Sequence, residues 1–103
     1  MLSACANHVP VVVDGFISGV GALIASKLHP EVKNYLTIAH KSAEPGHSAV
    51  LNELGLNPLF NFNMRLGEGT GAALGISIVE ASAKILTEMK TFEEAGVSKA
   101  KGE

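Results

Sequence analysis

Val9-Pro-Val-Val-Val-Asp-Gly15 is a β-branched run that stops at an acidic residue and a glycine. Its apolar residues are continuous rather than alternating, which predicts a strand buried on both faces within a parallel sheet. Apolar residues at helical spacing follow as far as residue 28, with Asp14 expected as the N-cap of that helix. His29-Pro30 is expected to end it. A strand that leads directly into a helix is the repeating unit of an α/β fold.

The same order recurs twice further along the chain. Residues 35–39 are predicted to form a second short strand, and residues 45–54 a helix that ends at Gly55. Residues 59–64 alternate between apolar and polar side chains, which indicates a third strand, with a bent extended segment as the alternative. Residues 72–90 are predicted to form the longest helix. Its apolar stripe consists of Leu74, Ile78, Ala81, Ile85 and Met89.

This alternation predicts an α/β fold with three layers, a Rossmann-like parallel sheet flanked by helices. Residues 1–97 are expected to form one α/β unit, and residues 98–103 a polar, disordered tail. Residues 2–6 resemble the last turn of a helix with nothing ahead of it. Three parallel strands bury little surface and leave open edges. We therefore expect this chain to be the C-terminal part of a larger fold.

Composition excludes several classes of protein. The net charge is −2 and no basic cluster is present, so a nucleic-acid partner is not expected. Cys5 is the only cysteine, which rules out an internal disulfide and fits a reducing cytoplasm. The most apolar stretch, residues 9–28, contains a proline, an aspartate and three glycines, so a membrane span is not expected.

Polar residues gather after each predicted strand, where α/β sheets bind their ligands. Asp14 and Gly15 follow the first strand, residues 40–44 follow the second, and residues 65–71 follow the third. Such a convergence of three strand ends predicts one site built from all three loops.

Arg65-Leu-Gly-Glu-Gly-Thr-Gly71 is the most informative of these loops. Glu68 lies between two glycines and just ahead of a helix, a position suited to a general base beside a phosphate or sugar site. The structural alternative is an exposed carboxylate stabilised by the helix dipole by about 0.3–1 kcal/mol. Arg65 is expected to pair either with a phosphate or with Glu68 or Glu44.

The remaining polar residues have weaker functional interpretations. Ser42, with Lys41 or the nearby backbone, is a candidate phosphate contact, and a turn or helix-cap hydroxyl is the alternative. Asp14 fits a helix cap better than a catalyst. His40 and His47 show no metal-binding spacing with each other or with Cys5, so no metal site is predicted.

Three segments together resemble one enzyme family, the nicotinate-nucleotide–dimethylbenzimidazole phosphoribosyltransferases of cobalamin nucleotide-loop assembly. They are Pro10-Val-Val-Val-Asp-Gly-Phe16, Ser42-Ala-Glu-Pro-Gly-His47 and Arg65-Leu-Gly-Glu-Gly-Thr-Gly-Ala72. Their order and spacing match the family, as does the ending from Thr91-Phe92 to Ala95-Gly-Val97. The resemblance covers residues 2–98 and only the C-terminal portion of the family protein.

The resemblance implies a transferase that moves phosphoribose from nicotinate mononucleotide to 5,6-dimethylbenzimidazole, giving α-ribazole 5′-phosphate and nicotinate. It implies that Glu68 is the base that accepts the benzimidazole proton and that Ser42 contacts the phosphate. Gly67 and Gly69 would let the loop lie against the substrate, and Asp14 and Gly15 would line the site. The resemblance implies no cofactor and a cytoplasmic homo-oligomer.

The family also places a phosphate loop, a second acidic residue and most of the azole pocket ahead of the matching segment. This chain alone is therefore expected to lack appreciable transferase activity. Two other functions stay open: a non-catalytic nucleotide- or phosphate-binding module, and a structural fragment that oligomerises through its sheet edge and apolar helix faces.

Overall fold

The computed structural model describes residues 1–98 and residue 102, so the disorder predicted for residues 99–101 and 103 lies outside the described residues. The chain forms, in order, α1 (Leu2–Ala6), β1 (Val11–Val13), α2 (Phe16–Leu28), the 3₁₀ helix η1 (Pro30–Tyr35), β2 (Leu36–His40), α3 (Pro45–Leu54), β3 (Pro58–Phe60) and α4 (Thr70–Glu88). The predicted α/β order is confirmed. Only η1 was not predicted; Pro30 stands at its start, where the missing N–H group costs nothing.

The three strands form one parallel sheet in the order β1-β2-β3. Val13 pairs with Ile38 in the first ladder, and His40 pairs with Phe60 in the second. The third strand is shorter than predicted because Asn61 and the residues after it leave the ladder. The chain stays beside the β2 exit, however, since the Ala43 N–H donates to the Met64 carbonyl at 2.9 Å. This outcome matches the bent extended segment given as the alternative.

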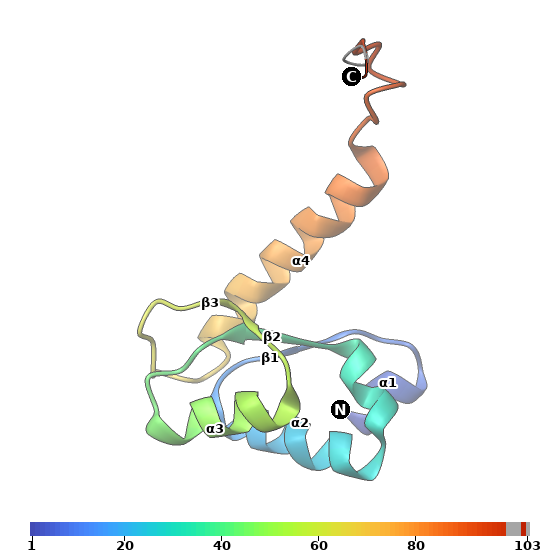
Figure 1. Cartoon of the computed structure of the whole chain (residues 1–103). Helices are drawn as coiled ribbons and strands as arrows, with labels where there is room; N and C mark the ends of the chain where they lie inside the picture. Colours follow the sequence, from blue (N-terminus) through green and yellow to red (C-terminus); the bar gives the residue numbers. More distant parts are fainter. Residues whose placement is uncertain (99–101, 103) are drawn as a thin grey trace.

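Helices cover the sheet from both sides, which gives the three layers expected (Figure 1). α2 and α3 lie together on one face, and α4 begins on the other. The core between the sheet and the first two helices includes Val13, Ile38 and Leu54, all nearly inaccessible to water. On the opposite face, a Cβ at Gly75 would lie 2.9 Å from a Val12 methyl carbon. Gly75 therefore lets α4 approach the sheet closely.

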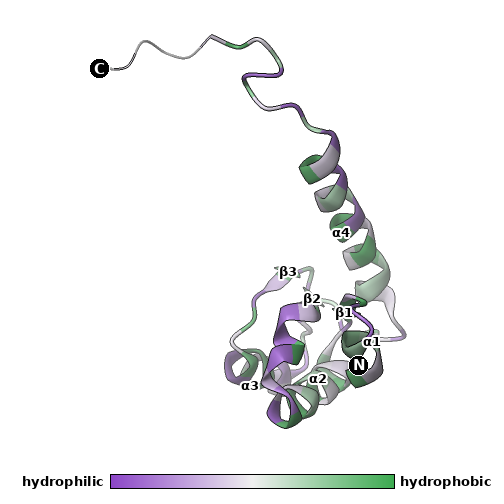
Figure 2. Ribbon diagram, turned by 90° about the vertical axis from the view of Figure 1, so that its right-hand side faces the viewer, coloured by the Kyte–Doolittle hydropathy of each residue, from purple (hydrophilic) through white to green (hydrophobic). Residues whose placement is uncertain are grey.

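Most of α4 projects beyond the sheet, and its apolar stripe is exposed. Ile85 is 55% exposed and Met89 is 68% exposed, whereas the buried residues of α4 are Gly71 and Gly75 in its first turns. Figure 2 shows hydrophobic residues along this projecting helix. The radius of gyration is 17.1 Å, compared with about 13 Å for a compact chain of this length. The stripe is exposed because the sheet reaches only the start of the helix.

Among the described residues, no helix has both the length and the apolar content required to cross a membrane.

Candidate active site

One cavity of about 680 Å³ opens at the carboxyl ends of the strands. The three loops after the strands, the end of β2 and the first turn of α2 supply its lining: Asp14, Gly15, Phe16, Ile17, Ser18, His40, Ser42, Glu44, Arg65, Leu66, Gly67, Glu68 and Gly69. All seven residues that the sequence indicated for the site are among them. A parallel sheet places its strand ends at the same edge, which explains why three segments far apart in sequence meet here.

Asp14 caps a different helix from the one expected. Its carboxylate accepts hydrogen bonds from the Gly69 N–H at 3.2 Å and from the Ala72 N–H at 2.9 Å, both at the start of α4. The prediction that Asp14 caps α2 was therefore wrong. Gly15 holds that position, and the Gly15 N–H donates to Ser18 Oγ at 3.0 Å. At the end of β1, the Asp14 side chain lies next to the start of α4, whose first N–H groups have no partner within the helix.

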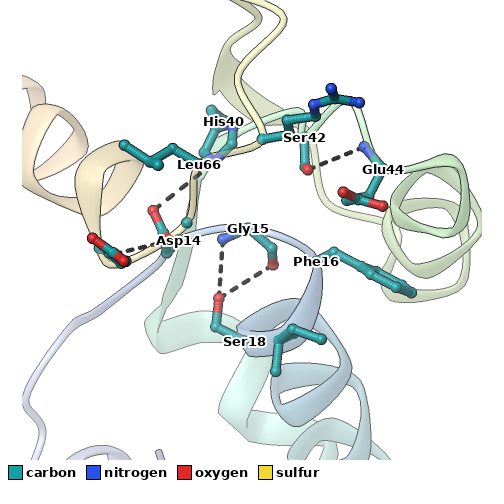
Figure 3. Close-up of a pocket in the computed structure, with 13 residues that line it drawn as sticks. Asp14, Gly15, Phe16, Ser18, His40, Ser42, Glu44 and Leu66 are labelled. Carbon is teal, nitrogen blue, oxygen red and sulfur yellow. Dashed lines mark hydrogen bonds and ion pairs between the residues drawn. The ribbon is translucent and has the colours of Figure 1, made fainter.

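Ser42 organises the second loop through its backbone and its hydroxyl group. Its N–H donates to His47 Nδ1 at 2.8 Å. Its Oγ accepts the Glu44 N–H at 3.2 Å, as Figure 3 shows. The hydroxyl thus makes the turn contact given as the structural alternative, while Ser42 also lines the cavity. Lys41 lines a separate hollow with α3 residues, so it is not placed to share a ligand with Ser42.

The third loop has an unusual backbone. Gly67, Glu68 and Gly69 have φ values of 78°, 57° and 78°, so three consecutive residues are left-handed. A Cβ at Gly67 or Gly69 would meet nothing within 4 Å, so these glycines serve the backbone conformation rather than close packing. Glu68 is exposed and adopts a conformation that costs a non-glycine residue about 1–2 kcal/mol. Backbone strain of this kind is typical of functional sites.

His40 is a cavity residue whose importance the sequence did not reveal. Its ring stacks on Phe60 with centroids 6.1 Å apart, and its Nε2 lies 3.9 Å from Asp14 Oδ1 (Figure 3). The residue is 2% exposed, and its Nδ1 has no hydrogen-bond partner among the residues that the structure describes. The available signal was an ionisable residue at the end of an otherwise uncharged strand.

His47 stands behind the cavity wall, where its surroundings disfavour the charged form. Burial lowers its pKa, and the nearby His40 and Lys41 lower it further. Its Nδ1 accepts the Ser42 N–H, so a proton at that nitrogen would break the contact that shapes the second loop.

Acidic side chains outnumber basic ones around the cavity. Three carboxylates, those of Asp14, Glu44 and Glu68, line it together with one guanidinium, that of Arg65. Such a lining favours groups that carry or develop positive charge, and leaves Arg65 and backbone N–H groups for an anion.

Comparisons with known proteins agree on one family. A family model described as phosphoribosyltransferase matches residues 1–97. Nicotinate-nucleotide–dimethylbenzimidazole phosphoribosyltransferases from Roseiflexus sp. (strain RS-1) and Geobacter sp. (strain M21) are 62% and 57% identical to the chain over 98 residues. Each alignment covers 95% of this chain and 28% of the relative. A crystal structure of the enzyme of that name from Thermus thermophilus superposes with a TM-score of 0.90 at 45% identity, covering 96% of this chain and 30% of that one.

Proposed function

We propose that this chain, which belongs to the phosphoribosyltransferase family, carries part of a transferase site. That part includes the general base. The reaction moves phosphoribose from nicotinate mononucleotide to 5,6-dimethylbenzimidazole, giving α-ribazole 5′-phosphate and nicotinate. The names of the relatives support both the donor and the acceptor. The chain spans about 28% of the length of those relatives, so the complete reaction is proposed for the full site.

The single observation that carries this proposal is the position of Glu68. It stands on the wall of the 680 Å³ cavity, on a left-handed loop at the start of α4. In the reaction, the ribose C1–N bond to nicotinate breaks and a C1–N bond to the azole forms. The pyridinium nitrogen takes the electron pair of the broken bond and leaves as a neutral ring nitrogen, so the departure of nicotinate needs no acid. The azole must lose the proton on its other nitrogen, and the Glu68 carboxylate accepts it.

The other cavity residues have binding roles in this proposal. Ser42 and Arg65 hold the phosphate, Arg65 as the cation among the lining side chains and Ser42 through its hydroxyl hydrogen. Gly15, Gly67 and Gly69 let the substrate lie close to the backbone. The carboxylates around them favour the positive charge of the pyridinium and of the ribose carbon during transfer.

Replacement of Glu68 by Gln tests the proposal. The test protein is a chimera in which this chain replaces the matching 98 residues of the Roseiflexus relative. Glu68→Gln should lower kcat by about 10²–10⁴ with little change in KM, since the amide keeps the shape but cannot accept the proton. Glu80→Gln, which makes the same change on the exposed side of α4, is the control. Equal kcat values in the two variants would refute the role of Glu68.

A second candidate is a non-catalytic nucleotide-binding module. It is favoured by the observation that this chain alone gathers all seven expected residues around one cavity. Calorimetric titration with nicotinate mononucleotide separates the two functions. Binding of nicotinate mononucleotide without turnover in the chimera would favour the module.

We also propose that the protein acts in the cytoplasm as a homo-oligomer. The free, buried thiol of Cys5 supports a reducing compartment. The exposed apolar stripe of α4 supports self-association, because large exposed apolar patches commonly mark contact surfaces.

A further inference from the structure

We propose that Asp14 is a positioning residue for Glu68 rather than a substrate contact. The proposal rests on the proposed role of Glu68 as the base and assigns the residue that holds it in place. Asp14 directly follows β1 and Glu68 precedes α4, so the two belong to different parts of the chain. They meet only because the sheet brings its strand ends to one edge.

The Asp14 carboxylate is fully engaged in hydrogen bonds to the start of α4. Both of its oxygens are used, Oδ2 by the Gly69 N–H and Oδ1 by the Ala72 N–H. Gly69 is the residue directly after Glu68. The carboxylate therefore fixes the backbone on the helix side of the base, where helix N–H groups otherwise have no partner.

The loop that carries Glu68 is strained and needs support of this kind. Glu68 has a φ of 57°, and both neighbours are left-handed as well. A strained conformation persists only where surrounding contacts determine it. Within the loop, the Thr70 N–H donates to the Gly67 carbonyl at 3.1 Å, which closes the turn. Asp14 supplies the link from that turn to the sheet.

Asp14 is itself supported from behind. The His40 ring is buried against Phe60 and faces the Asp14 carboxylate through Nε2. A Cβ at Gly71 would lie 2.1 Å from His40 Cδ2 and 2.8 Å from Asp14 Oδ1. Strand β2, the β1 exit and the first turn of α4 are thus in direct contact. The Asp14 side chain has no room to turn toward the His40 ring, and only 17% of it is exposed.

Hydrogen exchange on this chain tests the positioning directly. In Asp14→Ala, the Gly69 and Ala72 amides should exchange roughly five- to tenfold faster. In Asp14→Asn, the side-chain oxygen can still accept a hydrogen bond from the Ala72 N–H. The exchange rate of the Ala72 amide should therefore stay closer to the wild-type rate. Glu80→Gln should change neither amide. Unchanged exchange at Gly69 and Ala72 in Asp14→Ala would overturn the proposal.

Kinetics in the Roseiflexus chimera separate positioning from substrate contact. Asp14→Ala should lower kcat by about 10–100-fold with KM for nicotinate mononucleotide within about twofold, and Asp14→Asn should recover part of the loss. A raised KM with unchanged kcat would show that Asp14 binds substrate. If Glu68→Gln retained full kcat while the exchange results held, the proposed function would fail and the linkage of Asp14 to the loop would stand.

Discussion

At the scale of single residues, the site combines strain with contacts that are unusually close. Glu68 keeps a left-handed backbone that glycine would adopt more easily. Gly71 admits the His40 ring at a distance that no side chain would allow. His47 is buried, and its Nε2 has no hydrogen-bond partner within the described part of the chain. Each of these features is expected to lower the free energy of unfolding, and a separate prediction follows for each residue.

Replacing Glu68 by Gly should stabilise the fold while removing the proposed base. Relief of the left-handed strain, less the entropy cost of glycine, should raise the free energy of unfolding by about 0.5–1 kcal/mol. Glu80→Gly, in the middle of α4, should lower it by about 1 kcal/mol. Urea denaturation of both variants gives the comparison. A loss of stability in Glu68→Gly would show that the carboxylate itself holds the loop.

Gly71→Ala should destabilise the chain by about 1–3 kcal/mol, because its Cβ would collide with a buried ring. Gly21→Ala is the matched control, since a Cβ there meets only the Met1 Cε atom at 3.8 Å within the described residues. That variant should be neutral or more stable, by up to about 1 kcal/mol, through its higher helix propensity. Thermal or urea unfolding measures both, and equal effects would argue against the close contact.

Stability should fall at mildly acidic pH because of His47. In the unfolded chain its pKa is near the ordinary value of about 6.5, and in the folded chain it is lower. The unfolded state therefore binds more protons between these values, and stability rises with pH across that interval. The contribution is complete above about pH 6.5–7 and is lost as the pH falls through the folded pKa.

Urea unfolding measured from about pH 5 to 8 shows this dependence. His47→Asn provides the control, because the amide oxygen can accept the Ser42 N–H but does not titrate. The difference between the two proteins isolates His47 from the other histidines. Parallel curves for wild type and His47→Asn would contradict the prediction.

At the scale of elements, α4 is divided between two environments. Its first turns carry glycines that touch the sheet, and the remainder projects away with its apolar residues exposed. Amphipathic helices gain most of their stability from burying an apolar face. An uncovered face of this kind is an expected contact surface between copies of the chain.

Charges placed on the α4 stripe should weaken self-association. The double variant Ile78→Glu with Ile85→Glu puts carboxylates on the stripe and should shift the chain toward monomer in analytical ultracentrifugation, because burying an unpaired charge is costly. Ala83→Glu with Thr87→Glu adds the same charge to the opposite face of the helix and should leave the association unchanged. Equal behaviour of the two double variants would place the contact elsewhere.

At the scale of the whole molecule, this chain supplies only part of the site proposed above. The chain matches its relatives closely but spans about 28% of their length. Two substrates must be held together for transfer, and effective positioning supplies about 7–11 kcal/mol of catalysis in well-oriented reactions. The lining side chains of this chain include the proposed base, Glu68, and one cation, Arg65.

The chain alone should therefore bind nicotinate mononucleotide weakly and turn it over at less than about 1% of the rate of the chimera. A turnover assay with dimethylbenzimidazole and nicotinate mononucleotide measures this. The Roseiflexus chimera serves as the positive control. Turnover by the isolated chain near that of the chimera would show that these residues suffice.

The order of the elements, the parallel sheet and the meeting of three loops followed from the sequence. Continuous apolar runs of β-branched residues, helical periodicity and Gly55 at a helix end are local signals, so they can be read without the fold. The placement of Glu68 between glycines at the start of α4 is local as well. These features predicted that the loops after the three strands would meet. The seven candidate residues all line the cavity there, and their roles remain predictions.

Tertiary structure alone decided which groups these residues contact. Asp14 caps a helix whose first turn lies 58 residues away, rather than the helix that follows it directly. His40 joins the site because the parallel sheet brings its strand end against Asp14 and Gly71. The α4 stripe is exposed because the sheet ends after the first turns of the helix. In each case the partner comes from a distant segment, so local sequence preference carries no information about it.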